Sequence, residues 1–79
     1  MGAQIFEIID NQIKANDPPE TGEAMERLLA LGWDQLDAKK MVGQCIAIEI
    51  FNVMKHQEPF NKERYVRNLN KLPEEPFGD

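Results

Sequence analysis

The segment that decides the fold runs from Gln35 to His56 and has the sequence QLDAKKMVGQCIAIEIFNVMKH. Apolar residues recur along it every three or four positions, a spacing that predicts an amphipathic helix. Between Ile46 and Met54 the segment is apolar on nearly all sides, which is typical of a helix that neighbours cover from several directions. We therefore predict one long central helix over residues 35–56. Its inward face is expected to carry Ala38, Met41, Val42, Cys45, Ile46, Ile48 and Val53.

Upstream of this segment, a pair of prolines separates two shorter amphipathic helices, at about 3–15 and 19–31. Proline removes a backbone donor and disfavours helix in the residue before it, so the first helix should stop there. The N-cap of the second helix is either Asp17 or a residue near Thr21, and Gly32 stands where its left-handed C-cap belongs. The residues expected to face inward are Ile5, Phe6, Ile8, Ile9, Ile13, Ala24, Met25, Leu28, Leu29 and Leu31.

Capping residues also mark both ends of the long helix and the start of a fourth. Asp34 is a good N-cap for residues 35–56. A proline then ends that helix, and Asn61 caps a short helix at about 62–71. Phe60 and Tyr65 bracket Asn61 at the spacing of a hydrophobic staple. The sequence therefore predicts an all-α fold, a small bundle of four helices.

Length and composition restrict what such a bundle can be. The chain has 79 residues, a formal net charge of −5 and one cysteine. We expect a single helical domain over 1–72 and an extended acidic tail over 73–79. One cysteine excludes an internal disulfide and any multi-cysteine metal site. No apolar run is long enough to span a membrane and no signal peptide is evident, so a cytoplasmic protein with no membrane contact is expected.

One polar residue, Glu49, falls in the middle of the apolar face of the central helix. Cys45, Asn52 and His56 lie on the same side, so Glu49, Asn52 and His56 form a candidate buried polar site. A buried carboxylate must be paired, hydrogen-bonded or protonated. A structural pairing is the first interpretation, a ligand or partner pocket the second, and a metal or catalytic site the third. The partners available to a structural Glu49 are Arg27, Arg64 and Tyr65.

No catalytic triad, phosphate-binding glycine loop or metal-ligand spacing is present, so we expect no enzyme activity, no metal and no cofactor. The candidate contacts to a partner are apolar. Phe51 and Met54 belong to an apolar surface that the short fourth helix cannot cover, which predicts a homodimer with both residues at or beside the contact. The competing arrangement has helix 3–15 covering that side. Trp33 either closes the corner between two helices or anchors a partner.

Most of the chain resembles a family of small, uncharacterised bacterial helical proteins. The resemblance rests on DNQIKANDPPET, MERLLALGW, DAKKMVGQCIAIEIFNVM and EPFNKERYVRNLNKLP. It implies an all-α fold and a bacterial cytoplasmic origin, and it implies no activity. On this basis a non-enzymatic interaction or structural module that associates with itself is the first functional hypothesis.

A second resemblance is local and covers residues 23–42, EAMERLLALGWDQLDAKKMV. This stretch is similar to the first two helices of ubiquitin-associated domains, with Leu31-Gly32-Trp33 where those domains have Met-Gly-Phe or Met-Gly-Tyr. The chain departs from that pattern after Val42, where the helix continues without a polar loop. The resemblance implies an alternative function, binding of a peptide or a ubiquitin-like fold through the Leu31–Trp33 corner.

A second alternative comes from the charge of the fourth helix. Residues 62–71 carry four cations, Lys62, Arg64, Arg67 and Lys71, against a single anion. Such a surface predicts at most a weak contact with nucleic acid, because the chain as a whole is acidic and phosphate binding needs a positive field. A solvated helix face is the simpler interpretation.

Overall fold

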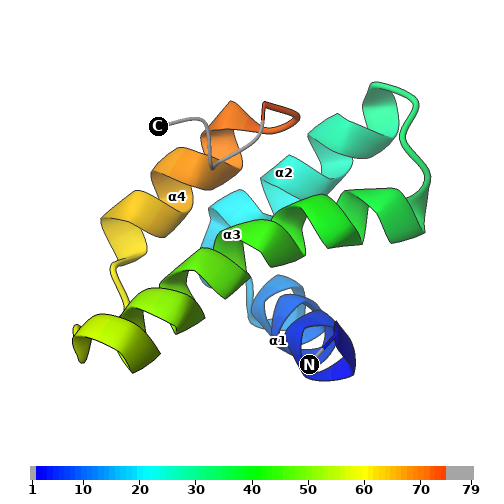
Figure 1. Cartoon of the computed structure of the whole chain (residues 1–79). Helices are drawn as coiled ribbons and strands as arrows, with labels where there is room; N and C mark the ends of the chain where they lie inside the picture. Colours follow the sequence, from blue (N-terminus) through cyan, green and yellow to red (C-terminus); the bar gives the residue numbers. More distant parts are fainter. Residues whose placement is uncertain (1, 75–79) are drawn as a thin grey trace.

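The computed structural model describes residues 2–74 and contains, within that range, four α-helices. They are α1 (Gly2–Ala15), α2 (Pro19–Ala30), α3 (Gln35–His56) and α4 (Lys62–Lys71), as Figure 1 shows. The predicted all-α fold is confirmed, with the third helix the longest. The bounds of α3 and α4 agree with those predicted from the sequence.

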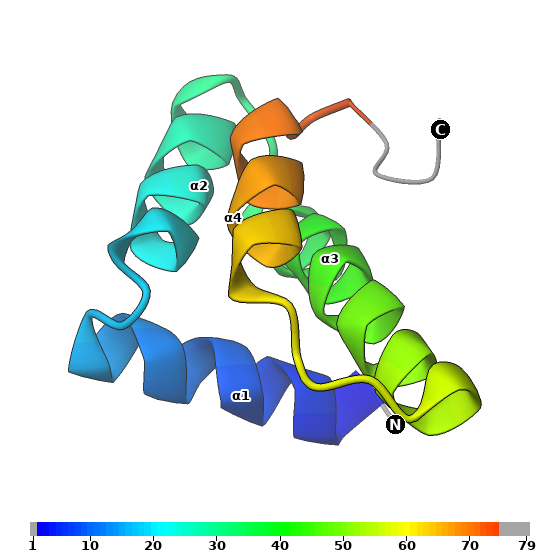
Figure 2. The same ribbon diagram turned by 90° about the vertical axis from the view of Figure 1, so that its left-hand side faces the viewer.

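The long α3 contacts each of the other three helices. Figure 2 shows α2 and α4 side by side and pointing the same way, with α1 crossing at their lower ends. In Figure 1 α3 passes in front of α2 and runs back against the direction of α2 and α4. The radius of gyration is 11.8 Å, close to the value of about 12 Å expected for a compact chain of this length. The helices therefore enclose one shared core.

The inward faces of all four helices meet in this core. Its apolar members come from every helix, and most of them follow the predicted stripes. The fully or nearly fully buried ones are Ile9, Ala24, Met25, Leu28, Ala38, Val42, Cys45, Ile46, Tyr65, Leu69 and Leu72.

The corner between α2 and α3 forms as its sequence predicts. Gly32 has φ of 102°, the left-handed region that glycine tolerates best. The N–H of Trp33 donates to the carbonyl of Leu28 at 3.1 Å, which satisfies a carbonyl at the end of α2. Asp34 then caps α3, since its Oδ1 accepts from the N–H of Asp37 at 2.8 Å.

The start of α4 also follows the prediction. Oδ1 of Asn61 accepts from the N–H of Arg64 at 3.0 Å, so Asn61 is the N-cap. The rings of Phe60 and Tyr65 pack edge to face with centroids 5.4 Å apart, which is the predicted hydrophobic staple. This pair fixes the angle at which the chain turns back from α3 into α4.

The predicted N-cap of α2 is wrong in both of its alternatives. Pro18 occupies the N-cap position and makes no side-chain cap bond. The first helical residue is Pro19, which has no N–H to be capped. Thr21 instead lies inside the helix, where its N–H donates to the carbonyl of Pro18 at 3.2 Å and its side chain is buried.

Four residues expected to face inward are exposed: Ile13, Leu29, Leu31 and Val53. Leu31 lies beyond the last residue of α2, so no neighbouring helix covers it. Val53 lies in the last turn and a half of α3, which projects past the other helices at the lower left of Figure 1. Regular spacing identifies the apolar side of a helix but not how far along it the neighbouring helices reach.

Two of the remaining expectations concern the chain as a whole. Among residues 2–74, no helix combines the length and the apolar character needed to cross a membrane. Of the predicted extended tail, Pro73 and Glu74 are exposed, and residues 75–79 lie outside the described residues.

Candidate functional site

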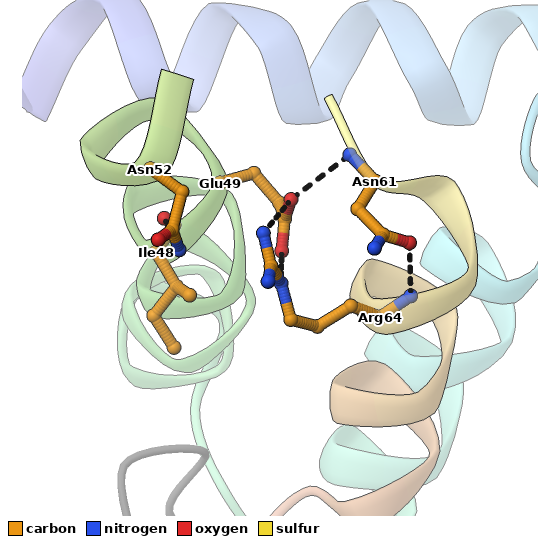
Figure 3. A network of polar contacts seen from close by, with 5 residues as sticks. All are labelled: Ile48, Glu49, Asn52, Asn61 and Arg64. Carbon is orange, nitrogen blue, oxygen red and sulfur yellow. Dashed lines mark hydrogen bonds and ion pairs between the residues drawn. The ribbon is translucent and has the colours of Figure 1, made fainter. Parts of the chain in front are cut away.

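The carboxylate of Glu49 is fully buried and receives three hydrogen bonds (Figure 3). Nε of Arg64 donates to Oε2 at 2.6 Å, and Nη2 donates to Oε1 at 3.0 Å. The backbone N–H of Asn61 donates to Oε1 at 3.0 Å. Of the three partners proposed from the sequence, Arg64 is therefore the one that pairs with Glu49.

This arrangement joins α3 to the first turn of α4. In a capping box, an acidic residue three positions after the N-cap accepts the N-cap N–H. Here that position holds Arg64, and Glu49 supplies the missing carboxylate from another helix. The hydrogen bond with Glu49 raises the pKa of the Arg64 guanidinium, so Arg64 stays charged. The geometry is that of a structural clamp between two helices.

A second polar cluster, absent from the sequence predictions, links α1, α2 and α4. The hydroxyls of Thr21 and Tyr65 both donate to Oε1 of Gln12 at 2.7 Å, and they lie 3.1 Å from each other. Thr21 and Tyr65 are fully buried, and burial raises the pKa of Tyr65 to about 12. The signal in the sequence was Thr21 itself, which shares the spacing of the buried residues of α2.

The guanidinium of Arg27 joins α2 to the C-terminal end of α4. It donates from Nη2 to the carbonyl of Leu69 at 2.5 Å and from Nε to that of Leu72 at 3.2 Å. A cation at a helix C-terminus is favourable, because the last carbonyls carry partial negative charge. Within the described residues, no buried side-chain nitrogen or oxygen lacks a hydrogen-bond partner. The interior polar groups therefore serve contacts between helices.

The other members of the candidate buried polar site do not join Glu49. Asn52 is half-buried and donates to the carbonyl of Ile48 in its own helix at 2.9 Å, as Figure 3 shows. His56 is exposed. The expectation that Asn52 and His56 are buried with Glu49 is therefore wrong, because α3 projects past its neighbours after Glu49.

Residues 2–74 contain no cluster of three histidine, cysteine or carboxylate side chains that could hold a metal ion. The thiol of Cys45 is fully buried, and desolvation raises its pKa to about 12. A thiol with such a pKa stays protonated at neutral pH and is a poor nucleophile.

The three candidate partner contacts are all exposed. Phe51 is 56% exposed and Met54 is 76% exposed, on the projecting end of α3. Both side chains are left exposed, so the competing arrangement, in which helix 3–15 covers them, is wrong. The neighbouring Ile50 is partly buried and packs against the core. Nζ of Lys55 lies 5.2 Å from the centroid of the Phe51 ring. Trp33 is also exposed, at the opposite end of α3.

The surface of the described residues has open hollows. A first, of about 410 Å³, lies between α1 and α3, a second, of about 750 Å³, lies on the outer side of α4, and a third, of about 470 Å³, lies at the turn between α3 and α4. Of the four cations predicted for a basic surface on α4, Arg64 forms an ion pair with Glu49. The first hollow is lined by Ile5, Phe6, Lys40, Gly43, Gln44 and Ala47, and the second by Lys62, Glu63, Val66, Arg67, Asn70 and Lys71.

Comparison of the chain with protein-family models, with curated proteins and with solved structures gives no match. The two resemblances described from the sequence therefore stay predictions.

Proposed function

We propose that this protein is a non-enzymatic protein–protein interaction module that associates with copies of itself, with a homodimer as the smallest assembly. The observation that carries the proposal is the exposure of Phe51 and Met54 on the projecting end of α3. They lie three residues apart, so they form one patch on the helix surface. Soluble monomers seldom leave large neighbouring apolar side chains in water without a binding role.

The non-enzymatic part of the proposal is supported by the use of the polar interior. Glu49 and Tyr65, the buried groups best suited to acid–base chemistry, each contact only side chains or backbone of neighbouring helices. They are fully buried, so a substrate does not reach them without separating the helices. The polar residues that line the surface hollows are exposed or half-buried.

A second candidate function is supported by a separate observation at the α2–α3 corner. Leu31 and Trp33 are both exposed there, as a corner that binds a peptide or a ubiquitin-like fold would require. The fluorescence of Trp33, the single tryptophan, distinguishes the candidates. A partner that binds at the corner shifts its emission at protein concentrations where the chain is monomeric.

Sedimentation equilibrium tests the proposal. We expect the wild type to exceed the monomer mass of 9.1 kDa at tens of micromolar, and Phe51→Glu/Met54→Glu to sediment as the monomer. Ile13→Glu/Leu29→Glu is the matched control, since it places the same two charges on exposed apolar residues of α1 and α2. A wild type that sediments as a single 9.1 kDa species would overturn the proposal.

A further inference from the structure

One side of α3 is open along its whole length. Leu36 is exposed near the first turn, the hollow between α1 and α3 lies in the middle, and Met54 is exposed in the last turn. Alternating steps of four and three along a helix keep residues on one side, as in the a and d positions of a coiled coil. Gly43 is buried against Ile5 of α1 and Ile50 packs on the core, so neither belongs to the open side. The exposed or half-buried residues along this side are Leu36, Lys40, Gln44, Ala47, Phe51 and Met54.

The two ends of this open side carry opposite charges. Asp37 follows Leu36 and is exposed, and Lys55 follows Met54 and is exposed. No ion pair within residues 2–74 involves either of them. Each end thus combines an uncovered apolar side chain with a charge that has no opposite charge in contact with it.

We infer that two copies pair through the open sides of their α3 helices in antiparallel orientation, an inference that rests on the proposed self-association. In the antiparallel pair, the Met54 end of each α3 packs against the Leu36 end of α3 in the second copy. This match brings Lys55 of one copy close to Asp37 of the other. The pairing is two-fold, so each contact occurs twice.

The middle of α3 suits the same alignment. With Met54 placed level with Leu36 of the second copy, Phe51 lies within one residue of the level of Lys40, and Ala47 lies within one residue of the level of Gln44. A lysine over an aromatic ring is a favourable contact, and Lys55 already makes one with Phe51 within the chain. The small side chain of Ala47 lets the two helices approach closely near the centre.

Charge selects this orientation over the parallel one. Parallel pairing would place Lys40 beside its own copy. It would also leave Asp37 level with Asp37 and Lys55 level with Lys55, so that neither has an opposite charge to contact. Like charges in contact are unfavourable, whereas the antiparallel arrangement makes two pairs of opposite charge. A contact between the two Met54 ends alone would likewise bring the Lys55 side chains together.

Disulfide cross-linking tests the alignment directly. Leu36→Cys and Met54→Cys are made separately in a Cys45→Ala background and are oxidised with glutathione, alone and mixed. Positions 36 and 54 lie about 27 Å apart along one helix, so they cannot be linked within a chain. We expect a covalent dimer from the mixture and none from either variant alone.

A charge exchange tests the same alignment without altering apolar contacts. Asp37→Lys and Lys55→Asp should each weaken dimerisation by about tenfold, and the variant that carries both changes should recover most of the loss. Circular dichroism confirms that each variant keeps its helix content. Glu58→Lys, a change of the same sign outside α3, is the control for net charge.

The outcomes separate this inference from the proposed function. A monomeric wild type overturns both. A dimer in which Met54→Cys cross-links with itself retains the proposed function and overturns the antiparallel alignment. The alignment is also overturned by a dimer in which Leu36→Cys and Met54→Cys do not cross-link in the mixture and in which the variant with both charge changes does not recover dimerisation. Cross-linking in the mixture alone, with recovery in the exchanged variant, supports the alignment.

Discussion

Glu49 and Met54 lie five residues apart on α3, and their exposure is the reverse of what their chemistry would suggest. The carboxylate is 0% exposed and the thioether side chain is 76% exposed. Glu49 has a complete set of partners in its own chain, whereas Met54 lies beyond the reach of the other helices. Folding of a single chain therefore explains the inner side of this part of α3, but not the outer side.

The two sides should therefore respond to different experiments. A buried ion pair contributes little net stability when intact. Loss of one partner is costly, because the remaining charge is then buried with no opposite charge beside it. An exposed apolar side chain contributes little to the folding of its own chain. Changes on the inner side should lower the free energy of unfolding, and changes on the outer side should alter association.

The largest effect is expected from Glu49→Ala. We expect a loss of about 3 kcal/mol in the free energy of unfolding, because Arg64 and the N–H of Asn61 lose their acceptor. Urea titration followed by circular dichroism measures it. Arg64→Ala and the double variant complete the cycle, and strictly additive losses would contradict a direct clamp between α3 and α4.

A second effect of a few kcal/mol is expected at alkaline pH. Burial raises the pKa of Tyr65 to about 12 from 10.0, and that of Cys45 to about 12 from 9.0. The unfolded chain loses these protons at lower pH than the folded chain, so stability should be constant below about pH 9 and fall towards pH 12. Urea titrations at stepped pH measure this fall.

Tyr65→Phe is the matched variant for that measurement. It should lose about 1 to 2 kcal/mol at neutral pH, because Gln12 and Thr21 lose a hydrogen-bond partner. The remaining alkaline fall should be shallower and should begin near the ordinary pKa of a thiol. An unchanged slope would mean that Tyr65 does not contribute to the pH dependence.

A smaller loss is expected from Asn61→Ala, which separates the cap of α4 from the ion pair beside it. The substitution removes the side-chain acceptor for Arg64 N–H but keeps the backbone N–H that binds Glu49. We expect a cost of about 1 kcal/mol, the usual value of an N-cap. A loss as large as that of Glu49→Ala would show that the cap and the clamp act as one unit.

The sequence predicted the four helices, the caps of α3 and α4 and the inward position of Glu49, but not the contacts between residues far apart in the chain. Helical spacing alone placed Glu49 among apolar neighbours, and Arg64 was one of three partners it allowed. The hydrogen bond between Gln12 and Tyr65 joins residues 53 positions apart, and no local pattern specifies such a contact. The exposure of Val53 likewise depends on where α1 and α4 lie along α3, which is a property of packing.

The smallest effect is expected from Met54→Ser, which tests the outer side. In dilute solution the free energy of unfolding should change by less than about 0.5 kcal/mol, because most of this side chain is already in water. Lys40→Ala, also on the open side, should behave in the same way. The proposed association with a second copy should make the wild-type unfolding midpoint rise with protein concentration, and Met54→Ser should reduce that rise. A loss above 1 kcal/mol in dilute solution would instead mean that Met54 packs against its own chain, and the contrast with Glu49 would no longer hold.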